Sequence, residues 1–579
     1  MGCRYVVLVD APVGGDGEHE PNYRAPGFDI TGMEHRLTCG RIKLFASPGT
    51  PTLAVPGGVL IGHLFFGGGE PVTPRTAPDL SSHERVQDML SKYWGEYVLI
   101  RTTAAHGDLL EVLRDPSGGV SCIYSLHGRD GCGFVTSDIA LATQHGLYRK
   151  QIDWEFISHA LAYPHLKTQR TGLSGVSELL PGCTLLVGTT DTTVRADWSP
   201  WTFVAKERRH YTVQRAVEDV RQAVRTVVAA WAGMDESILL ELSGGLDSSI
   251  LAGCLRGTST RVACCTLVTP VPGADERKYA GQMANYLGVP LQEEPLQFED
   301  ARFDFVPSAD TVTPRVSMLQ YASNEVMKRA GTSNDVNSYF SGGGGDSVFC
   351  YLGNAAPAAD AFKERGLAAG ITAIRELSTL HRCTFWKAGR LTFRKLIRGP
   401  KPVGEPDRSF LSPASTTDAE LHPWSGGPPD AFAGDRERIS DLAATQVFRD
   451  SMPRGALRWL RLPLLSQPVM EACLRVPTWM WISGGQNRAV ARSAFADILP
   501  PEVLNRRSKG TFMTYSGALY QRHKGQMLDY LLNGHLQARG LLDADALRRF
   551  MGGDLPARDQ SFMRIFELCT IENWVRHQY

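Results

Sequence analysis

The chain has 579 residues, and its 61 basic side chains balance 61 acidic ones, so the formal net charge is zero. This length predicts at least two domains, and the balanced charge excludes a chain-wide basic surface that would indicate nucleic acid or membrane as a partner. No apolar stretch is long enough to span a bilayer, and the first residues do not resemble a signal peptide. The scattered cysteines lack metal-ligand spacing, so we expect reduced thiols in a cytoplasmic protein.

The first region, residues 1–205, contains short β-rich runs that are separated by Gly, Pro, Asp or Asn: RYVVLVD, GVLIGHLFF, EYVLIRT, GFVTSDIA and CTLLVGTT. This spacing of strands and turn residues predicts a β-rich domain.

The pattern changes in the second region, residues 206–579. Apolar residues step by three and four through 211–232, which predicts an amphipathic helix. Strands are then predicted at 237–242, 261–268 and 336–343, and helices at 248–257 and 275–288, with Gly288 as a C-terminal cap. This alternation predicts an α/β domain with a parallel sheet covered by helices on both faces, followed by a mostly helical C-terminal part.

Two stretches of the second region have unusual composition. Residues 382–401 carry seven basic residues and no acidic one. Their apolar residues predict a half-buried helix whose charges face water; the alternative is a docking site for a leader peptide or a partner protein. Residues 399–435 are rich in Pro, Gly, Ser and Asp, which predicts a mobile loop.

The stretch LLELSGGLDSSI, residues 239–250, runs from a predicted strand into glycines and hydroxyls. Ligands of an open parallel sheet bind beyond the carboxyl ends of its strands, where this turn lies. Gly244 and Gly245 allow backbone N–H groups to approach an anion, and the next helix start adds further donors. Ser243 and Ser248 supply hydroxyls, so the stretch predicts a phosphate site, with Asp247 suited to the accompanying Mg²⁺. A glycine turn that only caps a helix is the alternative.

No Lys follows these glycines, so the stretch is not a Walker loop. It resembles the SGGxDSS loop of ATP pyrophosphatases, which cleave ATP to AMP and pyrophosphate and adenylate a carboxylate or carbonyl. The resemblance implies an ATP site formed in part by Leu242, Ser243, Gly244, Gly245, Asp247 and Ser248.

A second motif, SGGGGDSVF at 341–349, also follows a predicted strand. Together with the first it resembles the SGxGxDE(L/V)F segment of asparagine synthetase-like enzymes. The resemblance implies Asp247 and Asp346 as Mg²⁺ ligands that also act in catalysis, and it implies further neighbours of the nucleotide: Leu267, Gly342 and Gly343.

Two more positions follow from the same resemblance. Asp275-Glu276 matches a family DE position near the pyrophosphate, although helix capping explains Asp275 nearly as well. In LPPEVLNRRSKGTF, residues 499–512, Lys509 matches a family lysine that reaches the α-phosphate, with Arg506 and Arg507 beside it. The implied role of Lys509 is to stabilise charge that develops in the transition state.

The N-terminal region resembles the glutaminase domain of the same family, which implies an Ntn-type sandwich. The matching segments are RDPSGGVSCIY (114–124), FVTSDIALA (134–142) and LLPGCTLLV (179–187). Glutamine hydrolysis needs an N-terminal cysteine whose own α-amine acts as base, whereas the cysteine here is Cys3. GHLFFGGG, residues 62–69, replaces the family's glutamine-binding Asn-Gly segment. We therefore expect a degenerate domain, and we do not expect ammonia to be the nucleophile.

The subfamily is indicated by Gly343, which stands where asparagine synthetases have Glu and β-lactam synthetases have Tyr. We expect open space there, suited to a bulky peptide end. Ser466 replaces the Asp of the synthetase PFLD segment, and residues 460–510 closely resemble lasso peptide cyclases, the macrolactam synthetases of ribosomal lasso peptide pathways.

This resemblance implies an AMP-forming carbon–nitrogen ligase that uses ATP and Mg²⁺. It adenylates an Asp or Glu side chain of a precursor peptide and closes it onto the core α-amine. The implied partners are a leader peptidase and a leader-binding protein of the same pathway. Holding the threaded peptide requires a large cavity, which we expect residues 310–330 and 460–490 to line in part, with TWMWI (478–482) in the core.

The sequence leaves three alternatives to a lasso peptide cyclase. The chain resembles asparagine synthetases and β-lactam synthetases less closely, and either would be an amide ligase for a small molecule. A pseudoenzyme scaffold that binds ATP or peptide is an alternative of another class.

Overall fold

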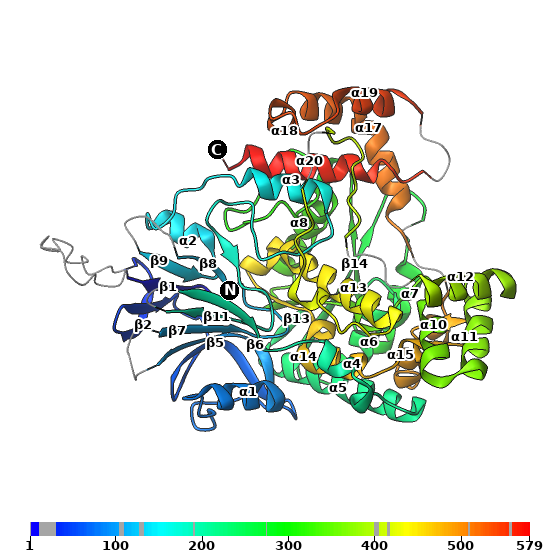
Figure 1. Ribbon diagram of the computed structural model, residues 1–579, viewed down its shortest axis with the longest axis horizontal. Helices are drawn as coiled ribbons and strands as arrows, with labels where there is room; N and C mark the ends of the chain where they lie inside the picture. The colour runs from blue at the N-terminus through cyan, green and yellow to red at the C-terminus, as the bar shows by residue number, and fades with distance from the viewer. Residues whose placement is uncertain are drawn as a thin grey trace, which may run out of the picture.

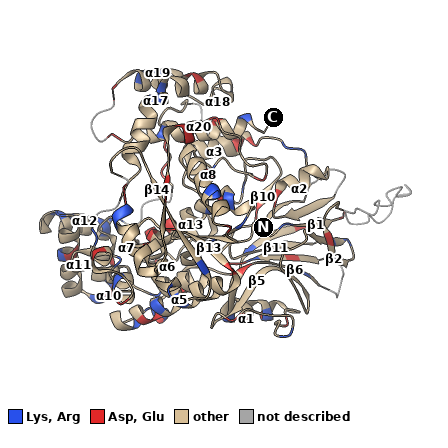
Figure 2. Ribbon diagram, turned by 180° about the vertical axis from the view of Figure 1, so that it is seen from behind, with Lys and Arg blue, Asp and Glu red and all other residues tan. Residues whose placement is uncertain are grey.

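The computed structural model of the protein describes residues 2–10, 30–103, 109–126, 132–188, 191–273, 275–398, 404–413, 417–507, 510–554 and 559–578. These residues form a β-sandwich, a parallel sheet flanked by helices, and a helical C-terminal part (Figure 1). Basic and acidic residues are interspersed over both β-regions (Figure 2), in keeping with the balanced charge of the sequence. The mixed α/β class is confirmed.

The sandwich consists of two antiparallel six-stranded sheets. The first has the order β10-β8-β9-β1-β3-β2, with strands Tyr5–Val9 (β1), Glu34–Cys39 (β2), Ile42–Ala46 (β3), Ile123–Ser125 (β8), Gly133–Thr136 (β9) and Ser177–Glu178 (β10). The second has the order β12-β11-β7-β6-β5-β4, with strands Thr52–Val55 (β4), Gly58–Phe66 (β5), Tyr93–Thr103 (β6), Leu109–Arg114 (β7), Cys183–Val187 (β11) and Thr192–Ala196 (β12).

Strand β1 shows why its sequence is apolar throughout. Tyr5 and Val7 point into the core between the two sheets, whereas Val6 and Leu8 point into a core that the first sheet shares with helices. A strand that is buried on both faces does not alternate between apolar and polar residues. The run VVLV is therefore a sign of a covered central strand.

All five runs predicted in residues 1–205 contain strands, but one of them ends early. Strand β9 stops at Thr136, because the Asp138 side chain accepts the Ala140 N–H and caps helix α2 (Ile139–Gln144). Other strands were missed because they are short or polar, as in β2, whose residues are mostly exposed. The helices of this region, also not predicted, are α1 (His83–Lys92) and α3 (Trp154–Ala162).

The second β-region is a parallel five-stranded sheet of order β15-β14-β13-β16-β17. Its strands are Ser237–Glu241 (β13), Arg261–Val268 (β14), Leu291–Pro295 (β15), Ser338–Ser341 (β16) and Trp459–Arg461 (β17). Helices α5 (Val213–Met234), α6 (Leu246–Leu255) and α7 (Arg277–Leu287) pack on one face and α8 (Met318–Ser333) on the other. The predicted doubly covered sheet is confirmed, as is Gly288, which ends α7 with a φ of +76°.

The remaining chain is mainly helical, as predicted, and none of its described helices is both long and apolar enough to cross a membrane. Helices α17 and α20 share a buried core with α3 and the first sheet (Figure 1). The elements are α4 (Trp201–Val204), α9 (Gly345–Val348), α10 (Ala356–Arg365), α11 (Leu367–Leu380), α12 (Phe385–Ile397), α13 (Ala433–Asp450), α14 (Gln467–Leu474), β18 (Ile482–Ser483), β19 (Gln486–Asn487), α15 (Ala489–Ala494), α16 (Pro501–Leu504), α17 (Met513–Leu532), α18 (His535–Ala538), α19 (Ala544–Gly552) and α20 (Met563–Arg576).

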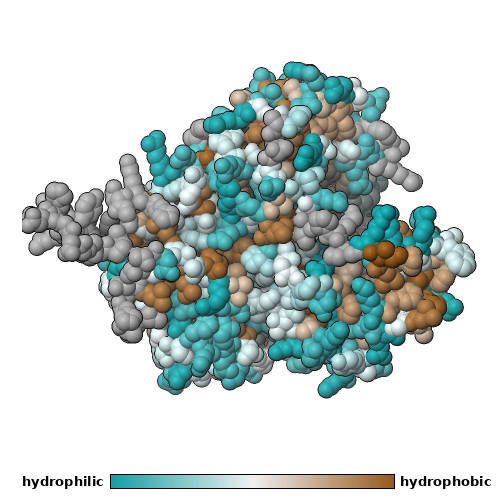
Figure 3. All heavy atoms as spheres, in the orientation of Figure 1, coloured by the Kyte–Doolittle hydropathy of each residue, from teal (hydrophilic) through white to brown (hydrophobic). Residues whose placement is uncertain are grey.

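Helix α12 differs from the expectation for residues 382–401, of which 399–401 lie outside the described residues. The helix forms, but Trp386, Phe393 and Ile397 are 82%, 63% and 65% exposed, while the buried positions are Ala388 and Thr392. The predicted burial is wrong for these three side chains, because small residues face α10 and α11 at their positions, whereas Phe385 packs against the same core. Apolar surface is visible at this edge of the molecule in Figure 3.

The expectation of a mobile loop at 399–435 is also corrected in part. Residues 399–403 and 414–416 lie outside the described residues. Trp424 is 1% exposed, its ring packs edge-on against Trp198, and its backbone carbonyl accepts the Trp201 Nε1–H at 2.7 Å. Three tryptophans thus anchor this part of the segment to the core.

A buried ion cluster joins the sandwich to the parallel sheet. Glu96 of β6 pairs with Arg461 of β17 at 3.1 Å and with Arg449 of α13 at 3.3 Å. Arg461 is 1% exposed, lies 3.4 Å from Asp235 and stacks on the ring of Trp231. Buried charges of this kind each need their partner, so the cluster fixes the position of one β-region against the other.

We predict that Glu96→Ala lowers the free energy of unfolding by about 3–5 kcal/mol, because it removes a buried partner of Arg461 and Arg449. The midpoint of urea unfolding, followed by circular dichroism, measures the effect. Glu218→Ala is the matched control, because the Glu218 side chain is 69% exposed; its effect should stay within about 0.5 kcal/mol. Equal midpoints for the two variants would contradict a joining role of the cluster.

Candidate active site

The predicted site lies at the topological switch point of the parallel sheet. β14 and β15 continue on one side of β13, whereas β16 lies on its other side. Such a switch opens a crevice beyond the carboxyl ends of the two strands. A cavity of about 960 Å³ lies there, and nine of the predicted site residues line it: Leu242, Ser243, Gly245, Asp247, Ser248, Leu267, Gly342, Gly343 and Asp346.

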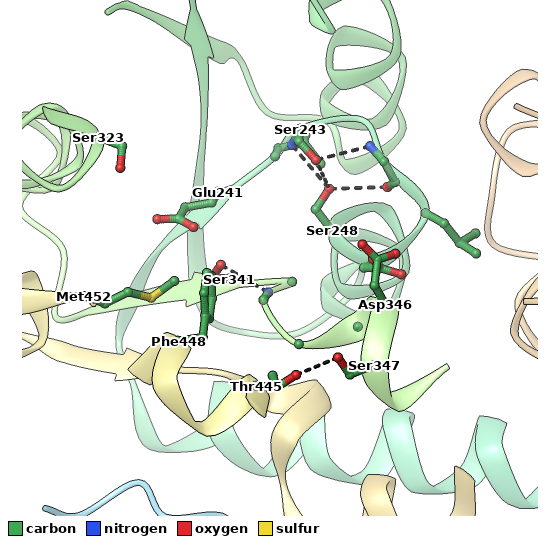
Figure 4. A pocket seen from close by; sticks show the side chains of 18 of the residues that line it. Glu241, Ser243, Ser248, Ser323, Ser341, Asp346, Ser347, Thr445, Phe448 and Met452 are labelled. Carbon is green, nitrogen blue, oxygen red and sulfur yellow. Dashed lines mark hydrogen bonds between the residues drawn. The ribbon is translucent and has the colours of Figure 1, made fainter. Parts of the chain in front are cut away.

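The turn after β13 presents donors to this cavity. Ser243 Oγ lies 3.1 Å from Ser248 Oγ and accepts the Gly245 N–H at 3.3 Å (Figure 4). Helix α6 follows with Gly245 as its N-cap and no side chain capping it, so its first N–H groups face outward for a ligand. Gly244 does not line the cavity. It has a φ of +67°, and a Cβ there would lie 2.6 Å from the Ala280 nitrogen.

The glycines of the second motif let two helix starts approach closely. A Cβ on Gly342 would lie 2.8 Å from the Ser248 nitrogen, and one on Gly345 would lie 2.5 Å from Cγ of Asp247. Gly344 has a φ of +84°, which side chains rarely allow. The run of glycines therefore brings α9 against the first turn of α6.

The carboxylates of Asp247 and Asp346 both accept hydrogen bonds from the same nitrogen atom. Nη1 of Arg488 donates to Asp247 Oδ1 and Oδ2 at 3.0 and 3.1 Å, and to Asp346 Oδ1 at 2.8 Å. The two carboxylates are thus within reach of one cation. The sequence motifs gave no indication of Arg488, which precedes α15 as its N-cap residue and lies far along the chain from both carboxylates.

Further arginines face the same cavity. Arg506 donates to the Gly244 carbonyl at 3.0 Å and to Glu276 Oε1 at 2.6 Å, which ties the segment after α16 to the phosphate-binding turn. Burial and the nearby Arg488 lower the pKa of Arg492 to about 10, so this guanidinium stays charged at neutral pH. Arg492 and Arg506 thus place guanidinium donors, which bind phosphate oxygens well, beside the carboxylates of the cavity.

Asp275 and Glu276 have different environments. Glu276 lines the cavity, whereas Asp275 does not. The Asp275 carboxylate accepts the Arg277 N–H at 3.1 Å and pairs with the Arg277 side chain, so helix capping explains Asp275. Lys509 lies outside the described residues, and its role stays a prediction. Arg507, which precedes the undescribed pair, is exposed.

The space beside Gly343 is filled, which corrects the expectation of an open gap. A Cβ on Gly343 would lie 2.2 Å from Cε1 of Phe448. Phe448 comes from α13 and lies in the cavity near Ser341 and Thr445 (Figure 4). The sequence could not reveal this, because nothing in residues 341–349 indicates which distant side chain packs on the glycine.

The walls of the cavity match the expectation only in part. From 310–330 the cavity is lined by Gln320, Ser323, Asn324 and Met327, but from 460–490 only Arg488 contributes among the described residues. Met480 and Trp481 are 5% and 0% exposed, so TWMWI is core as expected. Helix α13 forms the wall that was not predicted, with Asp441, Ala444, Thr445, Val447 and Phe448.

A second cavity of about 460 Å³ lies where the sandwich meets the parallel sheet. Its lining includes Gly2, Cys3, His63, Arg449 and Arg461, and Met452 lines both cavities. Burial raises the pKa of the Cys3 thiol to about 12. A thiol that stays protonated at neutral pH is a weak nucleophile. The expected loss of glutaminase chemistry stays a prediction.

Comparison with known proteins identifies the family of the part of the chain that forms the first cavity. The asparagine synthase family matches residues 219–576, which is more than half of the chain. The chain belongs to the asparagine synthase family. The matched range holds both glycine-rich motifs, so the resemblance to asparagine synthetase-like enzymes is confirmed at the level of the family. A search of curated proteins gave no match.

Two solved structures also match over part of the chain. One is glutamine phosphoribosylpyrophosphate amidotransferase from B. subtilis complexed with ADP and GMP, at 11% identity and a TM-score of 0.18 over 51% of this chain. The other is described as the allosteric regulatory enzyme of purine biosynthesis, at 10% identity and a TM-score of 0.18, also over 51%. The chain spans about 60% of their length, 60% and 59% respectively. A likeness of this size carries no argument about fold or function.

The residues of the cavity fit the ATP that the asparagine synthase family uses. Hydroxyls, a helix start and arginines face one space, as a triphosphate needs. The described residues hold no cluster of three or more His, Cys, Asp or Glu for a metal ion. Mg²⁺ at nucleotide sites needs only one or two carboxylates, because phosphates and waters complete its shell. Asp247 and Asp346 meet this requirement.

We predict that Gly345→Ala weakens binding of a non-hydrolysable ATP analogue with Mg²⁺ about tenfold or more, equivalent to about 1.4 kcal/mol. The reason is that the new methyl group would displace the Asp247 carboxylate. Isothermal titration calorimetry measures the affinity. Gly353→Ala is the matched control, because no atom lies within 4 Å of a Cβ built there. Unchanged affinity in Gly345→Ala would mean that the position of this carboxylate does not matter for the nucleotide.

Proposed function

We propose that this member of the asparagine synthase family is an ATP-dependent, AMP-forming ligase that closes a peptide into a macrolactam, as lasso peptide cyclases do. The proposal rests on one observation. The carboxylates of Asp247 and Asp346 lie together beside a turn that presents hydroxyl groups and helix N–H groups. Such a site is suited to a metal-bound triphosphate and not to a neutral ligand.

The reaction has two steps. In the first, a carboxylate oxygen of an Asp or Glu side chain of the precursor peptide attacks the α-phosphorus of ATP, and the bond to pyrophosphate breaks. In the second, the α-amine of the core peptide attacks the acyl carbon, AMP leaves with the bonding electrons, and the amine loses a proton. The products are the cyclic amide, AMP and pyrophosphate.

The described residues have distinct roles in this proposal. Ser243, Gly245 and Ser248 hold the pyrophosphate that leaves. Asp247 and Asp346 hold Mg²⁺, whose charge offsets that of the phosphates. Lys509 is proposed to act on charge at the α-phosphorus. The nucleotide is bordered by Leu242, Leu267, Gly342 and Gly343, whereas Gly244, which does not line the cavity, shapes the turn.

The volume and the walls of the cavity support a peptide substrate. About 960 Å³ is at the upper end of the range of roughly 300–1,000 Å³ for small-molecule sites, so a nucleotide leaves room for a peptide end. The wall from α8 is uncharged, with Gln320, Ser323, Asn324 and Met327. An uncharged wall of this kind suits a segment within a peptide, which carries neither terminal charge.

The raised pKa of the Cys3 thiol supports an amine that does not come from glutamine. With its pKa raised to about 12, Cys3 is protonated at neutral pH and does not attack an amide readily. The amine of the peptide itself is then the nucleophile. The proposal requires a leader peptidase to free this amine and a leader-binding protein to deliver the precursor, with all three proteins in the cytoplasm.

We predict that peptides with a free N-terminal amine and a downstream Asp or Glu stimulate release of AMP and yield a product lighter by one water. Asp247→Asn should lower this rate by about 100-fold or more, because the metal contributes several kcal/mol of charge stabilisation. Coupled detection of AMP and mass spectrometry of the peptide measure the two outcomes. Asp497→Asn, on the surface with a side chain that is 51% exposed, is the control and should keep full activity.

The outcomes separate the alternatives. AMP release with free aspartate and ammonia, but with no peptide, would identify a small-molecule amide ligase instead. Binding of ATP or peptide without AMP release under any of these conditions would identify a scaffold. Wild-type turnover in Asp247→Asn would show that the site is assigned wrongly.

A further inference from the structure

The guanidinium of Arg488 occupies the place between the two carboxylates that the proposed metal ion would take. Its Nη1 lies 2.8–3.1 Å from three oxygens of Asp247 and Asp346. Mg²⁺ binds carboxylate oxygens at about 2.0–2.1 Å, so an ion held by both carboxylates would need the position that this nitrogen occupies. Arg488 has to leave when the metal enters.

The charges around the two carboxylates determine when replacement of the Arg488 guanidinium by a metal ion is favourable. The two carboxylates carry two negative charges, and Arg488 already offsets one of them within hydrogen-bond distance. A metal ion without nucleotide would have to displace a charge-assisted pair and leave the guanidinium close to a second cation. A triphosphate changes this balance, because its oxygens bind the metal and also accept from the displaced guanidinium.

The surroundings of Arg488 would keep its side chain near the site after it leaves the carboxylates. It is 8% exposed, and its Nε is a buried donor without a hydrogen-bond partner among the described residues. Its guanidinium lies 5.6 Å from the ring centroid of Tyr351. Its backbone has a φ of +53°, a left-handed conformation that favours Gly or Asn and is held here between the β18–β19 hairpin and α15.

We propose that Arg488 is the counter-cation of the metal site in the nucleotide-free protein. Its guanidinium pairs with the two carboxylates there, and Mg²⁺ replaces it when a triphosphate binds. The inference rests on the proposed function and adds an order of binding to it. Metal alone binds poorly, and the metal enters with the nucleotide. Arg488 is thus a positioning residue for the two carboxylates before the reaction begins.

Metal binding to the nucleotide-free protein tests the proposal. Mn²⁺ alone is the probe, and electron paramagnetic resonance counts the free ion. We expect Arg488→Met to bind one Mn²⁺ at least about tenfold more tightly than the wild type, because the competing cation is gone. Arg221→Met, which removes a guanidinium from the surface pair with Asp497, is the matched control and should behave as the wild type.

Two further variants complete the design. Asp247→Asn combined with Arg488→Met should lose the gain, which would place the bound ion at this site. Arg488→Gln keeps a shorter, polar and uncharged side chain, and it replaces the Met variant if that variant does not fold. In EDTA the midpoint of thermal unfolding should fall in Arg488→Met and recover with Mg²⁺, whereas the wild-type midpoint should not respond.

Equal Mn²⁺ affinity in the wild type and in the folded Arg488 variants would overturn the inference. This failure differs from failure of the proposed function. If Arg488 does not compete with the metal, wild-type protein still forms AMP with a peptide. If the ligase assignment is wrong, no AMP forms with any peptide, whatever the metal affinity of the Arg488 variants.

Discussion

The site depends on the close approach of two helix starts that follow neighbouring parallel strands. β13 and β16 are paired in register, from Ile238 opposite Ser338 to Glu241 opposite Ser341. Each is followed within a few residues by glycines and then by a helix that carries one carboxylate near its start. The distance between the two carboxylates is therefore fixed by strand pairing, and the glycines remove the side chains that would keep the helices apart. The proposed phosphate donors and metal ligands both follow from this arrangement.

Much of this arrangement was predictable from the sequence, because it depends on local order along the chain. An apolar run, a glycine turn, hydroxyls and an apolar helix appear in sequence at 239–250, and each has a local physical meaning. The strand–helix alternation also indicated a parallel sheet, which places both motifs at the same edge. The apolar run of β1 predicted a strand, and the structure shows that this strand is covered on both faces.

What could not be predicted comes from side chains that are brought together by tertiary packing. A glycine at 343 indicates that something comes close, but not whether that is a substrate or, as here, the ring of Phe448. Arg488 lies far along the chain from the carboxylates that it joins. Helix α12 shows the opposite error: its apolar residues have the right period for a buried face, yet small residues are buried and Trp386 is exposed. The order of apolar residues shows the periodicity of a helix, but it does not show which face packs against a neighbouring helix.

The sandwich supports the second region through packing. Its first sheet shares a core with α17 and α20, and Glu96 pairs with two arginines of the second region. Without the sandwich, Arg449 and Arg461 would lose a partner, and α13, which carries both Arg449 and Phe448, would lose its support. Because Phe448 lines the first cavity, the sandwich helps to hold one wall of the candidate site in place, whatever chemistry the sandwich itself performs.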